Sequence, residues 1–573
     1  MRPWPLLALI GFAGCSFESA TVATIDNSCA GVASCAQGIC DENICVDDSG
    51  VSLALAIEVV RGATEAQVAT PASWAFAAAP SSGSTSRDLL LPATRQVIGT
   101  VRWNGSPVPA TLRFVRRMDE ALAPLAPLAI EVDTFRDVSA ANGSEGNDFS
   151  TVLVAGETYE LVVLPSSDMV MVPAQEPAPA IRSLPPLYLL FPIAEGDPSE
   201  PFRIDISFPV GLADDCTISR DIGCTLRAAV YSRDNEDQLD LPEAGLQVRA
   251  IDKQTGRVVS SIAETDVDGR FAIRVSNDAS DYLIRITSSA GRDPFPSVSV
   301  DPDLLFVDNP VDRLIYIPRL APVQVSGSVR DKIGRVVPGA TVRFLSTKIF
   351  GGVQLGLEGS FSRSATTNED GGFGAELLTG FYSITVTPPE DIANNWGIYY
   401  DVAAVGEEGA EIGVLVVPSQ IGLSGTVSTF RDEAAPGVTV LARARPSEDP
   451  NSAHRSQEVV SDDLGDFAMS VDIGLYDLQV KLPAESGFGW LVEPEVRTSL
   501  DEGDLQRAYR LEPPIAVDGV IRSSNGEIVP NALVRGYFFE QSSRGTRPLQ
   551  VAEAVSREDG SYRLLIAPGL AGE

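Results

Sequence analysis

The sequence predicts an all-β protein made of tandem Greek-key β-sandwich domains, and three observations support this prediction. Glycine and proline are abundant (49 and 40 of 573 residues), and valine, isoleucine, threonine and aromatic residues fall in short runs between them. No long stretch has the 3.6-residue period of a helix. One pattern of short strands recurs about every hundred residues. Together these features are typical of many short strands joined by turns.

Three landmarks define each repeat. The first is a strand with a central small residue, followed by a proline and a second strand, as at residues 325–329 and 338–342. The second is an Asp-Gly turn that leads into an aromatic residue, as at Asp370, Gly371 and Phe373. The third is a strand that begins with a tyrosine, which we expect to act as a tyrosine corner or to fill the core. These tyrosines are Tyr159, Tyr282, Tyr382 and Tyr476.

A last strand that ends in proline closes each repeat, and Pro318, Pro418 and Pro513 are 100 and 95 residues apart. This period indicates tandem domains, because solenoid units are only about 20–50 residues long. The predicted divisions are a signal peptide (1–15), a cysteine-rich tether (16–50), a partial repeat (51–95), four sandwiches (96–200, 201–320, 321–420 and 421–514) and an incomplete fifth sandwich (515–573).

The first and last repeats are incomplete. Residues 51–92 match only the second half of a repeat, whereas the repeat that starts at 515 stops at Glu573 before its tyrosine strand. An isolated half-sandwich would expose strand edges and apolar faces. Two explanations are open: the chain is truncated, which we favour, or the ends take strands from a neighbour.

The combination of V-x-G-x-V, P-G-A-x-V, D-x-x-G-x-F and G-x-Y-x-I-x-V resembles the carboxypeptidase regulatory-like domain. The match is clearest at Gly327, Pro338, Asp370, Gly371, Phe373 and Tyr382. The resemblance covers most of the chain after about residue 95 and implies a transthyretin-like, prealbumin-type β-sandwich. It does not select a function, because such modules occur in peptidases, receptors, starch-binding-like proteins and surface stalks.

The N-terminus predicts export. Arg2 precedes an apolar run that is too short to span a membrane but suits a signal peptide. Residues 12–15 resemble a bacterial lipobox, which implies that Cys15 is lipidated; an ordinary secretory signal is the other interpretation. With the cysteine-rich segment, this arrangement resembles surface lipoproteins of myxobacteria and related bacteria. We therefore expect an exported protein whose lipid binds the membrane, at the outer membrane or cell surface.

The cysteines beyond the lipobox predict disulfides, because their number is even and the chain is marked for export. Cys216 and Cys224 are expected to form a local bridge. Four others are expected to form two bridges of open connectivity, with a zinc site as the alternative: Cys29, Cys35, Cys40 and Cys45.

Charge and motifs argue against nucleic-acid binding and catalysis. The formal net charge of −35 repels phosphate backbones. The single histidine, His454, lies in a polar segment that predicts a solvated loop, and it cannot supply a two-histidine zinc site. The carboxylate pairs Asp266/Asp268 and Asp462/Asp463 fall at repeated turns, where aspartate serves the backbone geometry. We expect no cofactor, no metal and no enzymatic activity; calcium binding by surface carboxylates and glycoside hydrolysis by one of these carboxylate pairs are the minor alternatives.

Two functions follow from these features. The leading prediction is a structural or adhesive surface lipoprotein, in which tandem sandwiches form a stalk or a binding scaffold for other surface proteins. The alternative is a carbohydrate-binding protein, because two segments after tyrosine strands are rich in aromatic residues that could stack on sugars or could cover the core. These residues are Trp396, Tyr399, Tyr400, Phe488 and Trp490.

Overall fold

The structure is a computed structural model of the 573-residue chain. It describes residues 39–41, 44–46, 54–60, 73–78, 84–117, 129–134, 148–166, 184–197, 200–209, 215–216, 223–233, 240–277, 279, 281–288, 297–305, 313–318, 322–349, 357–390, 395–445, 454–483, 486–542 and 545–568. Within these residues, no helix is long and apolar enough to cross a membrane.

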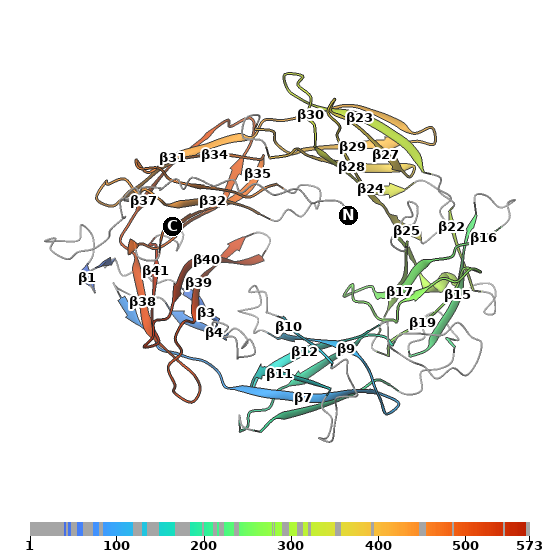
Figure 1. Ribbon diagram of the computed structural model, residues 1–573, viewed down its shortest axis with the longest axis horizontal. Coiled ribbons are helices and arrows are strands. Elements are labelled where there is room, and N and C mark those ends of the chain that lie inside the picture. The colour runs from blue at the N-terminus through green and yellow to red at the C-terminus, as the bar shows by residue number, and fades with distance from the viewer. Residues whose placement is uncertain are drawn as a thin grey trace, which may run out of the picture.

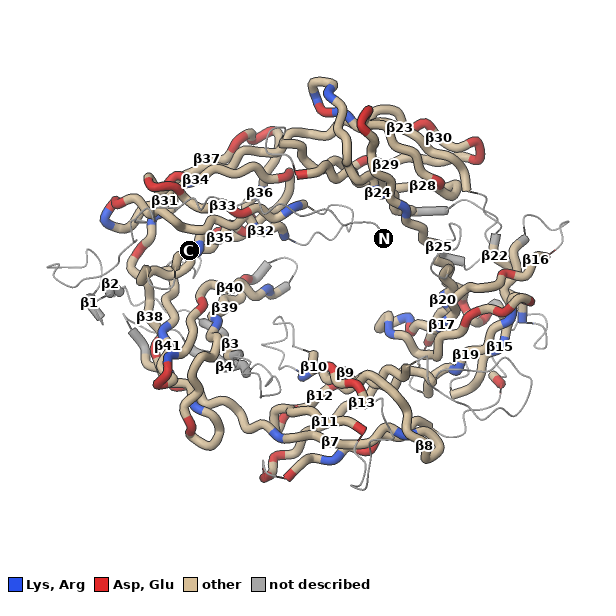
Figure 2. The backbone as a smooth tube through the Cα atoms, viewed as in Figure 1, with Lys and Arg blue, Asp and Glu red and all other residues tan. Residues whose placement is uncertain are grey.

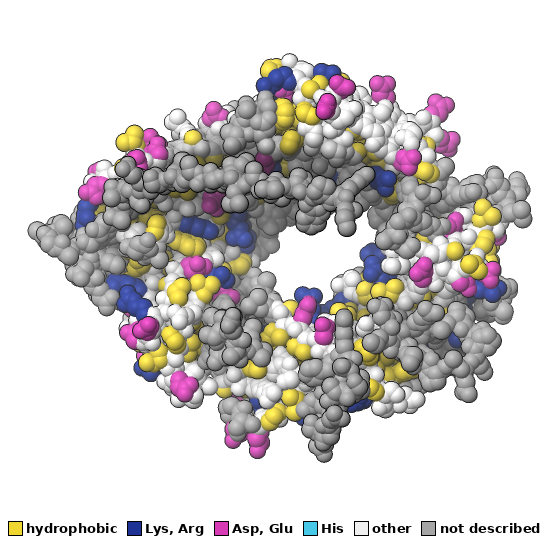
Figure 3. Space-filling view, viewed as in Figure 1, with side chains coloured by type: hydrophobic (Ala, Val, Ile, Leu, Met, Phe, Trp, Pro, Cys, Tyr) yellow, Lys and Arg dark blue, Asp and Glu magenta, His cyan; other side chains and the backbone are white. Residues whose placement is uncertain are grey.

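The described strands form five β-sandwiches arranged in a ring (Figure 1). Each sandwich has its own cluster of buried apolar side chains, which confirms the prediction of an all-β fold with tandem sandwich domains. An opening at the centre of the ring persists in the space-filling view (Figure 3). Acidic and basic residues are spread over all five sandwiches (Figure 2). The sequence predicts an extended row of domains, whereas the structure curves the row until its two ends meet.

The third sandwich shows the common topology. Its first sheet has the order β27-β23-β30, and its second has the order β26-β24-β28-β29. The first and last strands of the unit, β23 and β30, pair in parallel, whereas the other neighbours are antiparallel. The strands are β23 (Val323–Asp331), β24 (Thr341–Ile349), β26 (Ser362–Thr366), β27 (Gly372–Leu377), β28 (Gly380–Thr387), β29 (Tyr399–Val405) and β30 (Ala410–Val417).

The first, second and fourth sandwiches repeat this plan, including the parallel pairing of first and last strands. The first contains β7 (Thr94–Trp103), β8 (Ser106–Pro107), β9 (Ala110–Arg116), β10 (Ala129–Asp133), β11 (Phe149–Val154), β12 (Thr158–Pro165), β13 (Leu187–Pro192) and β14 (Phe202–Ser207). The second contains β15 (Thr225–Arg233), β16 (Leu241–Pro242), β17 (Leu246–Asp252), β18 (Ala263–Glu264), β19 (Arg270–Arg274), β20 (Tyr282–Ser288), β21 (Ser297–Val300), the 3-10 helix η2 (Pro302–Leu305) and β22 (Leu314–Pro318). The fourth contains β31 (Ile421–Thr429), β32 (Thr439–Ala444), β33 (Gln457–Val460), β34 (Asp466–Val471), β35 (Gly474–Lys481), β36 (Leu491–Thr498) and β37 (Leu505–Leu511).

The sequence landmarks meet across the sheets. Gly327 is the register partner of Phe373, and a Cβ at Gly327 would lie 2.6 Å from the phenyl ring. Glycine is therefore required where the aromatic ring crosses the first strand. Gly371 has a φ of 74°, which glycine adopts without strain in the turn before that ring.

The tyrosines fill the core and also form tyrosine corners. Tyr382 is 1% exposed, and its hydroxyl donates to the carbonyl of Leu378, 2.7 Å away. The hydroxyl of Tyr476 donates to the carbonyl of Asp472 at 3.1 Å. Both predicted roles therefore apply to the same side chains, because a ring that is buried needs a partner for its hydroxyl.

The fifth sandwich is built from the two incomplete repeats. Its sheets have the orders β41-β38-β5, with β6 also beside β38, and β4-β3-β39-β40. The N-terminal half contains β3 (Ala54–Val60), β4 (Ser73–Ala78), β5 (Ser84–Ser86) and β6 (Leu89–Leu90). The C-terminal half contains β38 (Ile515–Arg522), β39 (Leu533–Ser542), β40 (Gly545–Val555) and β41 (Ser561–Ile566). The two incomplete repeats lie side by side and share one core, an arrangement that neither explanation offered from the sequence describes.

Candidate functional site

The ring closure, defined as the contact between the N-terminal half and the C-terminal half, is one candidate functional feature. Strands β3 and β39 pair antiparallel, from Ala56 opposite Tyr537 to Val60 opposite Leu533. Strands β5 and β6 pair in parallel with β38, as the last strand does in the other four sandwiches. The N-terminal half therefore occupies the place that each other sandwich fills from its own repeat.

Apolar side chains from both halves share one core. Ile57 and Val59 are 0% and 3% exposed, and they belong to the same buried cluster as Val534 and Leu564. Leu89 of β6 is buried in this cluster too. Separation of the halves would expose all of these side chains to water, so the hydrophobic effect holds the closure together.

One buried carboxylate provides a polar contact across the closure. Glu58 is 4% exposed and accepts a hydrogen bond of 2.8 Å from the hydroxyl of Tyr537. Its Oε2 atom also lies 3.6 Å from the guanidinium of Arg535. Burial raises the pKa of Tyr537, and the hydrogen bond to Glu58 raises it further. The tyrosine thus remains a hydrogen-bond donor, and the carboxylate has a definite partner in the other half.

A cluster of charged side chains joins the fourth sandwich to the fifth, and we call it the junction cluster. Asp477 of β35 lies 2.7 Å from Arg445 and 2.6 Å from Arg547 of β40. Arg445 also lies 2.8 Å from Glu540 of β39 and 2.6 Å from Glu495 of β36. Because Asp477 is 2% exposed, its charge depends on Arg445 in its own sandwich and on Arg547 across the junction.

The junction cluster keeps Asp477 ionised. Burial alone would raise the pKa of this carboxyl, but the hydrogen bonds and charges of Arg547 and Arg445 outweigh burial and hold the pKa below its ordinary value. These residues could not be predicted from the sequence, because the ion pairs form between side chains of two successive repeats that no motif connects.

A second buried ion pair joins the third sandwich to the fourth. Asp472 is 1% exposed and lies 2.8 Å from Arg455. Arg455 also donates to the carbonyls of Pro388 and Trp396, and the amide of Ile398 donates to Asp472 at 3.2 Å. A groove of about 610 Å³ lies beside this contact. Its polar lining includes Glu390, Asn395, Gln420, Arg455, Gln457 and Asp504.

The junction between the first and second sandwiches has a different construction. The guanidinium of Arg257 lies 5.0 Å from the ring centroid of Tyr188 and 2.5 Å from Glu160. The hydroxyl of Tyr188 donates to the carbonyl of Val258 at 3.1 Å. Between the second and third sandwiches, strand β25 (Leu357–Ser360) pairs with β21 and then leads into β26. The sandwiches are therefore joined by contacts as well as by the chain.

The aromatic residues predicted as sugar contacts lie at or near these junctions. Trp396 is 7% exposed, and its indole nitrogen lies 3.4 Å from a carboxylate oxygen of Asp331. Trp490 is half-buried, forms a parallel bridge with Ile566 of the fifth sandwich, and has the ammonium of Lys481 over its ring. Phe488 is 5% exposed, whereas Tyr399 and Tyr400 are half-buried in β29. The structure does not bring the two groups together.

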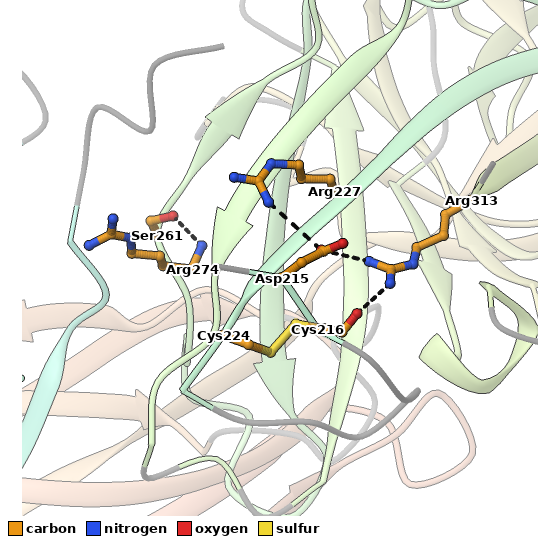
Figure 4. The surroundings of a disulfide bond; sticks show 7 residues. All are labelled: Asp215, Cys216, Cys224, Arg227, Ser261, Arg274 and Arg313. Carbon is orange, nitrogen blue, oxygen red and sulfur yellow. Dashed lines mark hydrogen bonds and ion pairs between the residues drawn. A yellow bond between two sulfur atoms is a disulfide. The ribbon is translucent and has the colours of Figure 1, made fainter. Parts of the chain in front are cut away.

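The disulfide predicted between Cys216 and Cys224 is confirmed, with an S–S distance of 2.02 Å (Figure 4). Arg313 donates to the carbonyl of Cys216 and to Asp215, which ties this bridge to the start of β22. Cys40 and Cys45 are register partners in the hairpin of β1 (Ile39–Asp41) and β2 (Ile44–Val46). The predictions for Cys15, Cys29 and Cys35 lie outside the described residues.

The polar residues considered for catalysis have structural contacts. His454, predicted to be solvated, is instead half-buried, with its ring centroid 4.8 Å from that of Tyr476 and its Nε2 atom at hydrogen-bond distance from the carbonyl of Leu475. Asp266 and Asp462 accept backbone hydrogen bonds within their turns, as the sequence predicts. Across the described ranges, no group of three or more His, Cys, Asp or Glu residues could hold a metal ion.

Comparison with known proteins finds no matching family model and no matching curated protein. The resemblance to carboxypeptidase regulatory-like domains therefore stays a prediction. Among solved structures, a streptococcal ancillary pilin is 12% identical and covers 50% of this chain and 99% of its own, with a TM-score of 0.22. The minor pilin GBS52 of Streptococcus agalactiae is 14% identical over 33% of this chain and 95% of its own, with a TM-score of 0.20. BcpA, the major pilin subunit of Bacillus cereus, is 11% identical over 50% and 99%, with a TM-score of 0.16. At TM-scores this low, these likenesses carry no argument.

Proposed function

We propose that this chain is a non-enzymatic scaffold at the cell surface, held to the membrane by a lipid on Cys15. The observation that carries the proposal is the ring closure. Two halves that are more than 400 residues apart in the chain complete one sandwich, so the buried contacts of both ends serve the shape of the whole molecule. A fixed ring displays its outer loops in a constant arrangement, which suits a structural or adhesive role.

The buried charges support this proposal. Glu58, Asp472 and Asp477 are almost fully buried, and each has an arginine partner. Arg547 lies in the sandwich next to that of Asp477, and Arg455 also bonds the chain of the neighbouring sandwich. Such groups are costly to bury and are consistent with a role in fixing the relative positions of the sandwiches.

Two measurements test the scaffold. Small-angle scattering of the exported protein should fit a ring with a central opening, whereas a rod-like profile would contradict it. Palmitate labelling of the expressed protein should disappear in Cys15→Ser. Unchanged labelling would remove the lipid anchor and leave the ring intact, so the two parts of the proposal are tested separately.

Carbohydrate binding is a second candidate, favoured by the groove between the third and fourth sandwiches. Its amides and carboxylates could bond sugar hydroxyls, and Trp396 contributes to one wall. A glycan array on the full chain tests this candidate. Binding should weaken in Gln457→Ala and persist in Gln506→Ala, which changes an exposed amide outside the groove. An array without any bound glycan would exclude it.

A further inference from the structure

The ring closure consists of two half-sandwiches that complete each other, and nothing in their contacts requires them to belong to the same molecule. We propose that the closure is also a self-association site, at which the N-terminal half of one copy completes the C-terminal half of a second copy. This inference concerns pairing between copies and stands independently of the proposed function.

Backbone pairing supplies the first argument. Strand β39 offers its edge to β3 along five register pairs, and β38 offers its edge to β5 and β6. The amide of Leu91 donates to the carbonyl of Arg522 at 2.8 Å beyond the end of β6. A strand edge binds a complementary strand from its own chain or from another chain by the same hydrogen bonds.

Side chains restrict which strand can occupy that edge. An incoming strand must place apolar groups where Ile57 and Val59 enter the core, and a carboxylate where Glu58 meets Tyr537 and Arg535. The N-terminal half carries this pattern, because Ile57 and Val59 point to one face of their strand and Glu58, between them, points to the other face. We assign a second copy of this chain as the occupant, because its N-terminal half carries all three side chains in this order.

The C-terminal half is tethered to the fourth sandwich, in addition to sharing a core with the N-terminal half. The junction cluster fixes Glu540 of β39 and Arg547 of β40 to the fourth sandwich. A C-terminal half without its partner is thus presented at the end of the row of sandwiches, where a second copy can reach it. Closure within one chain is favoured by effective concentration, and exchange between copies competes with it as the protein concentration rises. Reciprocal exchange gives a closed dimer, and one-way exchange gives an open series.

Charge-swapped variants of the full chain provide the test. Glu58→Arg and Arg535→Glu each place like charges at the closure of their own chain. When the two variants are mixed and refolded together, exchange in both directions restores opposite charges at both closures. We expect the mixture to form a species of twice the mass of one chain, measured by light scattering, at several-fold higher yield than either variant alone. The double variant Glu58→Arg/Arg535→Glu should have the mass of one chain.

Each outcome of this experiment either supports or contradicts exchange between copies. A mixture that keeps the mass of one chain, while the double variant folds, would overturn the proposal. If either single variant is insoluble alone, co-expression provides the readout, and a soluble two-chain species supports exchange. Aggregation of the co-expressed pair beside a soluble double variant would count against it. Arg535 also pairs with Glu553 within its own half, and the double variant controls for the loss of that pair.

Discussion

The third and fifth sandwiches have the same strands in the same order, but their strands come from different parts of the chain. The third is continuous from β23 to β30, so its last strand returns to the first within about a hundred residues. In the fifth, the strands equivalent to β28, β29 and β30 are β3, β4 and β5 with β6, from the other end of the chain. A comparison of the two sandwiches therefore distinguishes the stability of the sandwich fold itself from the free-energy cost of closing the ring.

The two sandwiches differ more in the chain entropy that is lost when their strands come together than in the contacts that the strands make. Loop-closure entropy grows only slowly with loop length, so a separation of hundreds of residues adds a few kcal/mol at most. The four intervening sandwiches are folded and joined by fixed contacts, which already bring the two halves near each other. We therefore expect the junctions, together with the fifth core, to determine whether the ring closes.

The largest expected effect comes from a charge in the fifth core. Val59→Asp places an unpaired carboxylate among buried apolar groups and should cost more than about 4 kcal/mol. We expect residues 54–60 and 515–566 to lose hydrogen-exchange protection together, while the other four sandwiches keep theirs. Val386 is the counterpart of Val59 in β28, and Val386→Asp should unfold the third sandwich instead. Protection that persists at 515–566 in Val59→Asp would show that the two halves are not one cooperative unit.

The junction cluster should give the next largest effect. Asp477→Asn removes the more deeply buried of the two carboxylates that Arg445 and Arg547 share and leaves them only Glu540 in common, at a cost of about 3 kcal/mol. The folded pKa of Asp477 lies below the unfolded value of about 3.9, so its stabilisation is present above that pH and is lost as pH falls through the folded pKa. Thermal melts between pH 2 and 7 should therefore show a weaker acid dependence for the variant than for the natural chain.

Asp205→Asn is the matched control for that prediction. Asp205 pairs with Arg203 at 2.9 Å, but both side chains are about half exposed, and the hydrogen bond that Asp205 accepts from Thr100 can also be accepted by the asparagine oxygen. Solvent screens such a pair, so the change should stay within about 0.5 kcal/mol. Equal destabilisation by the two substitutions would mean that the buried ion pairs of Asp477 stabilise the protein no more than an exposed ion pair does.

A smaller effect compares two kinds of last strand: one that comes from the same repeat, as in the fourth sandwich, and one that comes from the N-terminal half, as in the fifth. A Cβ at Gly519 would lie 2.0 Å from the carbonyl oxygen of Arg87, and one at Gly425 would lie 1.9 Å from that of Arg507. Alanine at either glycine should cost about 1–3 kcal/mol through overpacking. Gly519→Ala should relieve the clash by release of the N-terminal half, seen as faster exchange at 84–91, whereas Gly425→Ala should disturb only the fourth sandwich. Unchanged exchange at 84–91 would contradict this.

The sequence could predict the sandwich but not the ring. Gly327, Phe373 and Tyr382 report local geometry, because a turn, a ring and a hydroxyl need partners a few strands away. The contact of Glu58 with Tyr537 spans 479 residues, and no periodic pattern encodes it. The one available signal was that the two incomplete repeats supplied complementary halves.

The exposure of the candidate site residues could not be predicted from the sequence either. Trp396 could be assigned to a loop after the tyrosine strand, but its burial depends on Asp331 and on the neighbouring sandwich. The polar neighbours of His454 predict exposure to solvent, yet its ring packs on Tyr476. In both cases the tertiary contact, rather than the local composition, determines exposure.

The smallest effect compares two hydroxyls. Tyr382→Phe removes the hydrogen bond to Leu378 within the third sandwich, and Tyr562→Phe removes the one from the C-terminal half to the carbonyl of Arg87. Each should cost about 1 kcal/mol in denaturant melts. Burial raises the pKa of Tyr382 to about 12, so its stabilisation should fall as pH rises between 10 and 12, and Tyr382→Phe should reduce this alkaline loss. Of the two substitutions, only Tyr562→Phe should speed exchange at 84–91, because the Tyr562 hydroxyl bonds across the ring closure and the Tyr382 hydroxyl bonds within its own sandwich.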